Sequence, residues 1–443
     1  MKTKLTLITV SLLCFINFIC VSQNGKPAQV GQEILKEIES KHPYSGSKSN
    51  DLELVSSQRI YEKNAGYIAV HFEKFNLNHE DYLIIRNPDN TRSWKYSFDT
   101  ENRKKFWSIH IYGQEVILEI YSKNKKGGYV YKIDKIAKGY ELDLVNKTYA
   151  TEALCGPDDS REARCYLNSE PFIYERSRAV ARLLINGTGA CTGWLVGDDG
   201  HLMTNEHCIA NAASANNVTV EFMAEGGTCT TDCRSWFGCG GTIEAVTTTL
   251  VRVDSNLDYA LLQMPNNVSS QYGFLQLRDE SPIQGERIYI PQHPQAWGKR
   301  IAVESTDIND TGGFARVNSI VEPRCGGNGN DIGYYADTQQ GSSGSPVLGY
   351  DDNLVIALHH CGACPNRGIP IQEIITDLGN DLPNNAIGHG TSIDDITTLC
   401  YGNSRTINLN NNENNPVNWQ VSSNITILSS NNNYITVGAN SAS

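Results

Sequence analysis

The chain of 443 residues has little positive charge and, beyond its first residues, no long apolar run. Its 37 Lys and Arg residues against 49 Asp and Glu residues give a formal net charge of −12. Nucleic acids and anionic membranes are recognised by concentrated positive charge, so we expect neither as a partner. Because no later apolar stretch is long enough to cross a bilayer, we also predict no membrane span.

The first 22 residues have the pattern of an export signal. Lys2 and Lys4 precede a mostly apolar core over 5–19, and small residues follow near Ser22. This predicts a signal peptide over 1–22 and a secreted, extracellular protein. Cys20 also invites a lipoprotein interpretation, but the two bulky residues before it do not suit that processing.

Cysteine is absent from the segment between the signal and Cys155, and the eleven cysteines beyond the signal lie between Cys155 and Cys400. In an oxidising compartment we expect disulfides rather than metal thiolates. Residues 361–364, with two histidines directly before them, have side chains that could bind zinc. Their spacing fits no paired CxxC…CxxC pattern, so we expect no metal. Eleven is odd, which leaves one thiol free, intermolecular, or paired outside this chain.

The length predicts two or three domains. Residues 23–150 contain a short helical signal over 32–41, followed by alternating apolar and polar residues between turn clusters. Short strands about 8–12 residues apart predict a small β-sandwich. The segment holds no catalytic constellation, so we interpret it as a propeptide or folding helper. A carbohydrate-binding sandwich is the alternative, with four aromatic residues available for stacking: Tyr67, Trp94, Trp107 and Tyr112.

The end of the chain is rich in asparagine. Residues 403–416 read as a polar linker, and 417–443 hold two strand patterns of a partial β-module. So short a piece would be marginal alone, and it is either a truncated repeat or a cell-surface sorting segment.

The chemistry centres on Gly341-Ser342-Ser343-Gly344-Ser345-Pro346. A serine in a glycine-flanked turn can present its hydroxyl to a substrate, while the N–H groups of Gly341 and Ser343 can point at one oxygen. Earlier in the chain, His207 follows a strand-like run and Asp258 stands at the head of an apolar run. An imidazole can take the serine proton, and a buried carboxylate can fix its tautomer. Because three such residues occur in the order His, Asp, Ser, an ordinary turn without a catalytic role is a poor explanation of the serine motif.

These motifs, with 190–196, 292–294 and 299–301, resemble the chymotrypsin-like (trypsin-like) serine peptidases. The likeness runs from about Cys155 to about Leu382 and is strongest to the secreted bacterial branch with lysyl endopeptidase and the glutamyl endopeptidases. It implies an all-β chain in which a double β-barrel peptidase domain over 151–402 follows the sandwich.

By the same resemblance, His207 is the general base, Asp258 its orienting partner and Ser343 the nucleophile. The oxyanion is held by Gly341 and Ser343, and no cofactor is needed. The resemblance further implies a disulfide between Cys191 and Cys208, and a role for Cys155 and Cys165 in tying the start of the domain to later loops.

The chain departs from trypsin at the residue before the nucleophile, which is Ser342 instead of an aspartate, and no Ile-Val-Gly-Gly-like start precedes the domain. Activation by a new N-terminal amine is therefore not available. Lys147, in a polar junction, is a candidate self-processing site if the enzyme cuts after basic residues.

Two residues point to opposite substrate preferences. Asp337 lies six residues before Ser343, at the base of the P1 pocket in this family, where a carboxylate would pair with Lys or Arg. The glutamyl enzymes also carry an Asp-Thr pair like Asp337 and Thr338, and they meet an acidic P1 with a histidine at the place of His359. We favour a basic P1, since Asp337 would repel an acidic side chain.

The sequence thus predicts a secreted, monomeric serine endopeptidase that acts on protein or peptide substrates. A glutamyl-specific enzyme is the alternative. A catalytically inactive secreted binding or adhesive protein of the same fold is the rival from another functional class.

Overall fold

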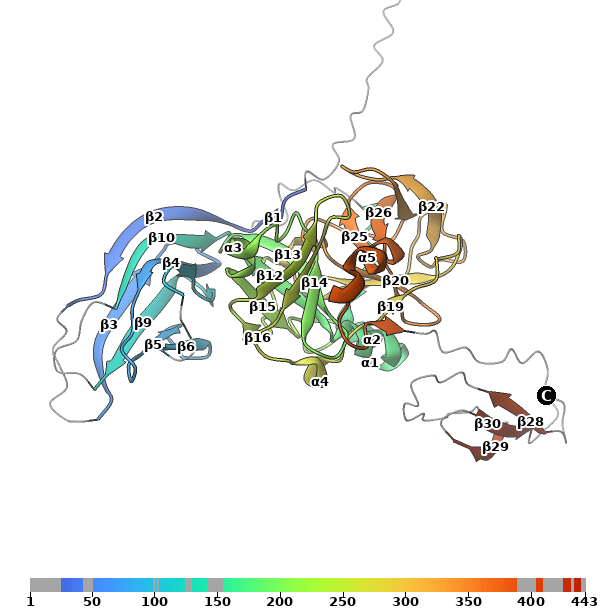
Figure 1. Ribbon diagram of the computed structural model, residues 1–443, viewed down its shortest axis with the longest axis horizontal. Coiled ribbons are helices and arrows are strands. Elements are labelled where there is room, and N and C mark those ends of the chain that lie inside the picture. Colours follow the sequence, from blue (N-terminus) through green and yellow to red (C-terminus); the bar gives the residue numbers. More distant parts are fainter. Residues whose placement is uncertain are drawn as a thin grey trace, which may run out of the picture.

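A computed structural model describes residues 25–42, 51–98, 101, 103–123, 130–141, 154–388, 404–408, 425–431 and 434–439. These residues form many strands and a few short helices, which confirms the all-β prediction (Figure 1). The predicted signal peptide, the domain boundary near residue 150, Lys147, Cys400 and most of the Asn-rich linker lie outside the described residues. Within the described part of the chain, no helix combines the length and apolar character needed to cross a membrane.

The N-terminal module consists of two antiparallel sheets that share one apolar core, as predicted for a sandwich. One sheet has the order β2 (Gly31–Glu39), β10 (Tyr131–Gly139), β4 (Tyr67–Phe75) and β7 (Phe106–Trp107), with β8 (Ile111–Tyr112) also on β4. The other has the order β3 (Glu53–Tyr61), β9 (Glu115–Ser122), β5 (Tyr82–Arg86) and β6 (Ser93–Ser97). Alternating residues of β4, β5, β9 and β10 fill the space between the sheets.

The prediction of a helix over 32–41 is wrong, because this stretch is strand β2 and pairs with β10. Ile34 and Ile38 are four residues apart, a spacing that places two side chains on one face of a helix and equally on one face of a strand. Leu35, which a helix would bury beside them, is 87% exposed.

The peptidase region contains two larger sheets. The first has the order β16 (Thr242–Ala245), β15 (Val218–Phe222), β12 (Val180–Ile185), β13 (Gly189–Val196), β14 (His201–Thr204), β18 (Tyr259–Gln263) and β17 (Thr249–Asp254), with β1 (Ala28–Gln29) on β13. The second has the order β11 (Arg161–Glu162), β21 (Arg300–Ala302), β20 (Ile288–Gln292), β24 (Pro346–Gly349), β25 (Val355–Cys361), β26 (Asn366–Pro370), β23 (Asn330–Tyr334) and β22 (Val317–Pro323), with β19 (Leu277–Arg278) on β25 and β27 (Ile387–Gly388) on β19.

Short helices lie around these sheets: α1 (Tyr166–Ser169), α2 (Pro171–Ser177), α3 (Ala212–Ala215), α4 (Ser269–Tyr272) and α5 (Ile371–Leu378). The strands of both sheets are buried almost throughout near the motifs of interest, as in β13 and β25. Further along the chain, β28 (Ser404–Asn408), β30 (Tyr434–Ala439) and β29 (Ile425–Ser430) make a small sheet around Ile407, Ile435 and Val437. The predicted strand over 417–421 lies outside the described residues.

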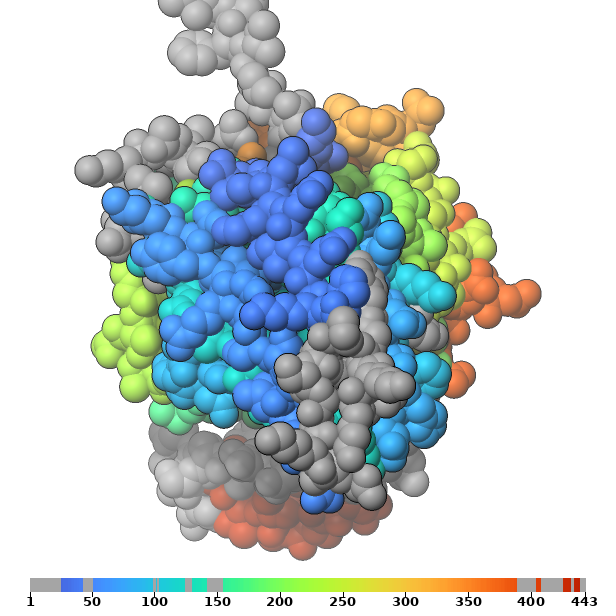
Figure 2. All heavy atoms as spheres, turned by 90° about the vertical axis from the view of Figure 1, so that its left-hand side faces the viewer, coloured from blue at the N-terminus to red at the C-terminus, as the bar shows by residue number. Residues whose placement is uncertain are grey.

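The sandwich packs directly on the first sheet of the peptidase region. The Tyr67 hydroxyl donates to the carbonyl of Gly187 at 2.9 Å, and the Trp107 N–H donates to Asn217 Oδ1 at 2.9 Å. Arg92 reaches the buried carboxylate of Glu221 at 2.9 Å. In Figure 2, seen from the sandwich side, the blue residues of the sandwich lie in front of the green residues of the peptidase region.

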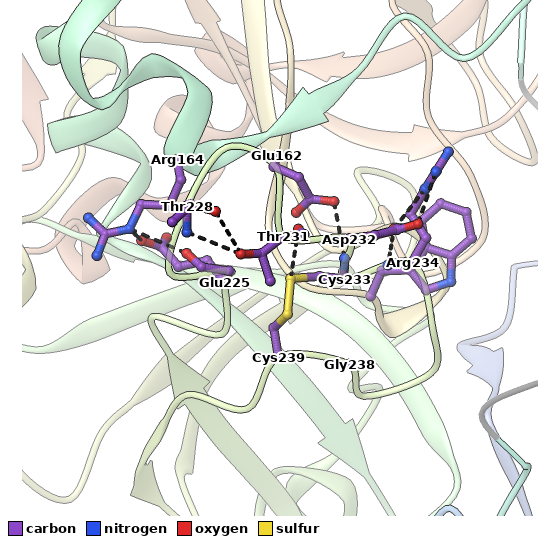
Figure 3. The surroundings of a disulfide bond; sticks show 12 residues. Glu162, Arg164, Glu225, Thr228, Thr231, Asp232, Cys233, Arg234, Gly238 and Cys239 are labelled. Carbon is purple, nitrogen blue, oxygen red and sulfur yellow. Dashed lines mark hydrogen bonds and ion pairs between the residues drawn. A yellow bond between two sulfur atoms is a disulfide. The ribbon is translucent and has the colours of Figure 1, made fainter.

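A disulfide-closed loop of the peptidase region supplies aromatic residues to this contact. Trp236 and Phe237 lie between Cys233 and Cys239, and both belong to an apolar cluster with Tyr67 of the sandwich. Figure 3 shows how the bridge is fixed, since Glu162 accepts the Cys233 N–H at 3.4 Å. The loop therefore presents a pre-ordered apolar surface to the sandwich.

Candidate active site

His207 and Asp258 are held together by two contacts. Nδ1 of His207 lies 2.7 Å from Oδ2 of Asp258, and the backbone N–H of His207 donates to Oδ1 at 2.9 Å. His207 follows β14, and Asp258 sits just before β18, the strand that pairs with β14. The register of these two strands thus brings together residues that are 51 positions apart.

Asp258 is held in an unusual conformation. Its φ of +42° is left-handed, which is uncommon for a residue other than glycine and points to a functional constraint. Its carbonyl accepts a hydrogen bond from Asn205 Nδ2 at 2.8 Å. Burial raises the pKa of Asp258, but hydrogen bonds from His207 and His360 outweigh this effect and leave the pKa well below its usual range.

Ser343 lies in a turn between β23 and β24 whose glycines have positive φ, +92° at Gly341 and +87° at Gly344. The turn packs on the strand pair that leads to His207. The carbonyl of Ser343 accepts the Thr192 N–H at 2.9 Å, and a Cβ on Gly344 would stand 2.5 Å from Thr204 Oγ1. Only glycine fits there, so the sequence signal Gly-Ser-Ser-Gly reflects a real steric need.

The predicted oxyanion donors have no competing acceptor. In the described part of the chain, the N–H groups of Gly341 and Ser343 donate to no other residue, whereas those of Ser342 and Gly344 are used, each at 2.9 Å. Ser343 is 3% exposed. No hydrogen bond joins Ser343 Oγ to His207 among the described residues, and such contacts in substrate-free enzymes commonly tighten only when substrate binds.

Asp337 is a structural acceptor in this arrangement. The Cys155 N–H donates to Oδ1 at 3.1 Å, and the Asp159 N–H donates to Oδ2 at 2.7 Å. The carboxyl is nearly buried, and this burial raises its pKa to about 6. Asp337 therefore fastens the start of the peptidase region to the segment that leads into Ser343.

Thr338 and His359 are both buried near Asp337 and the serine turn. Nδ1 of His359 is 2.7 Å from the Tyr334 hydroxyl, while Nε2 of His359 and Oγ1 of Thr338 have no hydrogen-bond partner among the described residues. Burial lowers the pKa of His359 to about 3, with contributions from His360 and His207, so the ring is neutral.

The sequence analysis did not identify His360 as a site residue and noted it only as one of two histidines beside a possible zinc-binding pattern. Its Nδ1 lies 3.2 Å from Oδ2 of Asp258, the oxygen that also faces His207. The available signal was the His359-His360 pair: in a strand, neighbouring side chains point to opposite faces, so only one of the two can lie at the predicted pocket.

The described residues hold five disulfides: Cys155–Cys364, Cys165–Cys229, Cys191–Cys208, Cys233–Cys239 and Cys325–Cys361. Cys191 and Cys208 pair as the resemblance implied, which ties β13 to the histidine turn. Both sulfurs lie close to His207, but a disulfide offers no thiolate to a metal ion.

A family model for the trypsin-like peptidase domain matches residues 191–358, the segment that contains His207, Asp258 and Ser343. The chain contains a trypsin-like serine peptidase domain. The predicted family is thereby confirmed, and the two-sheet architecture described above is consistent with its fold.

Two curated proteins are similar to this trypsin-like chain. It is 40% identical over 328 residues to the secreted RxLR effector protein 73 of Plasmopara viticola, covering 71% of this chain and 79% of that protein. It is 30% identical over 218 residues to the uncharacterized protein y4fB of Sinorhizobium fredii, covering 45% of this chain and 30% of that protein.

Solved structures of proteases are also similar to it. The active form of the Rv3671c protease from M. tuberculosis is 17% identical and covers 56% of this chain and 95% of that one, with a TM-score of 0.35. The MamO protease domain from Magnetospirillum magneticum is 17% identical and covers 46% of this chain and 96% of that one, with a TM-score of 0.33.

Proposed function

We propose that this protein is a secreted serine endopeptidase that hydrolyses peptide bonds through an acyl-enzyme. His207 takes the proton of Ser343 as its oxygen attacks the peptide carbonyl, and then gives that proton to the leaving amine. The N–H groups of Gly341 and Ser343 stabilise the oxyanion. Water, activated by His207, then attacks the acyl group and releases Ser343.

The double contact between His207 and Asp258 is the observation that carries this proposal. With Nδ1 of His207 facing a carboxylate at 2.7 Å, the Nδ1 atom carries the proton and Nε2 remains available as the base. The second contact, to the backbone of His207, restrains the carboxylate against rotation. Asp258 stays ionised because its pKa is lowered, and it can therefore stabilise the imidazolium that forms.

The experiment is to compare the protein with its Ser343→Ala variant on a diverse peptide library, with products identified by mass spectrometry. A fluorophosphonate probe, which labels activated serines, gives a second readout. We expect cleavage and labelling to require Ser343. If a correctly folded sample neither cleaves nor reacts after removal of its N-terminal module, the inactive binding protein becomes the better hypothesis.

The contacts of Asp337 and His359 support the glutamyl alternative over a basic P1. Both oxygens of Asp337 already accept hydrogen bonds from backbone N–H groups, so its negative charge is less available to a Lys or Arg side chain at P1. If the Tyr334 hydroxyl donates to Nδ1, the neutral ring of His359 carries its proton on Nε2 and can donate it to an acidic side chain. The hydroxyl of Thr338 is a second free donor. In the peptide library, cuts after Glu that disappear in His359→Leu would support this assignment, and cuts after Lys or Arg would contradict it.

Secretion and synthesis as a zymogen complete the proposal. The five disulfides and the similarity to a protein named as a secreted effector support export. For latency, the support comes from Gly25, which lies against the catalytic ring: a Cβ added to it would be 3.4 Å from Cβ of His207. From there the chain continues as β1, paired with Ala190 and Gly189 of β13, and enters the sandwich. An N-terminal strand in this place restricts access to His207.

A further inference from the structure

A second histidine and a second aspartate stand behind the His207–Asp258 pair. Nδ1 of His360 faces Oδ2 of Asp258 at 3.2 Å, and Nε2 of His360 faces Oδ2 of Asp331 at 2.9 Å. The side chain of His360 is 2% exposed and that of Asp331 is fully buried. An imidazole is thus enclosed between two carboxylates.

This geometry fixes the charge of His360. Ionised carboxylates only accept hydrogen bonds, so a ring that bonds one at each nitrogen must carry both protons and be an imidazolium. Burial opposes that charge, but the hydrogen bonds and charges of Asp258 and Asp331 outweigh it and raise the pKa of His360. Its sequence neighbour His359 is neutral.

Asp331 is itself held rigidly. Nε of Arg324 lies 3.0 Å from its Oδ1, and the Cys325 N–H donates to its Oδ2 at 3.1 Å. Arg324 is also buried and binds Glu373 of α5 at 2.8 Å. Four alternating charges therefore follow one another from Asp258 through His360 and Asp331 to Arg324.

The chain around these residues connects the two sheets of the peptidase region. Arg324 and Cys325 lie just after β22, in the connection to β23, and the disulfide Cys325–Cys361 ties this connection to the end of β25, directly beside His360. The same connection contacts the turn that carries the catalytic aspartate, because the Asn328 N–H donates to Asn256 Oδ1 at 3.1 Å. A hairpin from the second sheet thereby supports a turn of the first.

We propose that His360, held by Asp331, is a positioning residue that keeps the Asp258 carboxylate aimed at His207. The inference rests on the proposed function. Without His360, Oδ2 of Asp258 keeps only its contact with Nδ1 of His207, and the carboxylate is held less firmly in the orientation that faces that nitrogen. The effect should appear in the chemical step and not in substrate binding, because His360 touches no substrate.

Two substitutions at His360 separate positioning from general packing. Asn places its amide nitrogen near the position of Nδ1 and can still donate to Asp258, whereas Gln reaches the position of Nε2 and donates to Asp331 instead. For His360→Gln we expect kcat to fall about 10- to 100-fold, the value of one hydrogen bond to a buried charge, with KM within about twofold. His360→Asn should retain kcat within about fivefold of the unaltered enzyme. His201→Gln, which removes a histidine paired with Asp199 at 2.6 Å in the peptidase region itself, is the matched control and should leave kcat unchanged.

Proton NMR gives a readout that needs no turnover. The Nδ1 proton of His207, bonded to a carboxylate, should give a low-field signal that shifts or broadens in His360→Gln and persists in His360→Asn. Equal losses of kcat in the Asn and Gln variants, or no loss in either, would overturn the proposal.

If both His360 variants fail to fold, the Asp331→Asn variant tests the proposal instead. It preserves shape, and we expect a smaller fall in kcat of about threefold to tenfold, accompanied by a shifted low-field signal. An unchanged signal would refute the role of His360. If the unaltered protein reacts with no peptide and no fluorophosphonate, the proposed function fails, while the NMR comparison still tests the contact between His360 and Asp258.

Discussion

Replacing Asp337 by Asn should change how the stability of this protein depends on pH. The buried carboxyl has a pKa of about 6 in the folded protein against 3.8 for an ordinary aspartate. The folded state therefore binds more protons than the unfolded state between these values, and stability falls as the pH rises through that window. At about 1.4 kcal/mol per pKa unit, the full loss from Asp337 is about 3 kcal/mol, most of which occurs between about pH 4 and pH 7.

The asparagine of the Asp337→Asn variant would be neutral at every pH. Its oxygen can accept one of the two N–H groups from Cys155 and Asp159, but its NH2 group faces the other donor, so one hydrogen bond is lost at a cost of about 1–3 kcal/mol. We expect the variant to be the less stable protein near pH 4, and the difference to close by pH 7 as the unaltered protein loses its advantage.

The assay is urea unfolding at pH 4, 5, 6 and 7 in a Ser343→Ala background, which prevents self-digestion. Asp351→Asn, which removes an exposed carboxyl, is the control and should give a curve parallel to that of the parent. Parallel curves for Asp337→Asn would refute the assigned environment of Asp337.

In the active background, Asp337→Asn should leave the P1 preference unchanged. A fall of about 30-fold or more in cleavage after Lys or Arg would instead identify Asp337 as the selecting charge.

Three further predictions concern stability and latency. Glu221→Gln leaves the fully buried guanidinium of Arg182 without its charge partner at 2.8 Å, so we expect a loss of about 3–5 kcal/mol in unfolding free energy, measured by chemical denaturation; an unchanged midpoint would contradict this. Replacing both Cys325 and Cys361 by Ser opens a bridge across 36 positions and should cost about 2–4 kcal/mol of stability, together with a lower kcat from a looser hairpin; thermal unfolding and peptide hydrolysis test both effects. Deleting residues 25–27 removes Gly25, which lies against His207, and should increase the rate of peptide hydrolysis; equal rates for deleted and full-length protein would argue against latency by this segment.

The fold class and the need for glycine in the turn that carries Ser343 were predictable from local sequence. Short runs of β-branched and aromatic residues between turn clusters indicate strands wherever they occur, and the glycines around Ser343 are needed for a backbone conformation that other residues rarely adopt. The same local reasoning failed for β2, because Ile34 and Ile38 are spaced four apart, which suits both a helix and a strand. Pairing with β10, about 100 residues away, decided between them.

The likeness in sequence also predicted a set of site residues, but it did not indicate what each side chain bonds to. Asp337 was predicted at the base of the P1 pocket, yet its carboxylate accepts hydrogen bonds from the N–H groups of Cys155 and Asp159, about 180 positions earlier in the chain. His360 was signalled only by the His359-His360 pair, since its carboxylate partners, Asp258 just before β18 and Asp331 in β23, meet it only when the sheets pack together.

By itself, then, the sequence determined an all-β trypsin-like chain with His207, Asp258 and Ser343 in order, because glycine conformations and alternating apolar residues are local properties. Only the tertiary structure decided which carboxylate is satisfied by backbone amides, which histidine is neutral and which is charged, and what lies against the ring of His207. Those outcomes depend on burial and on partners distant in the chain, and both are set when the sheets and the sandwich come together.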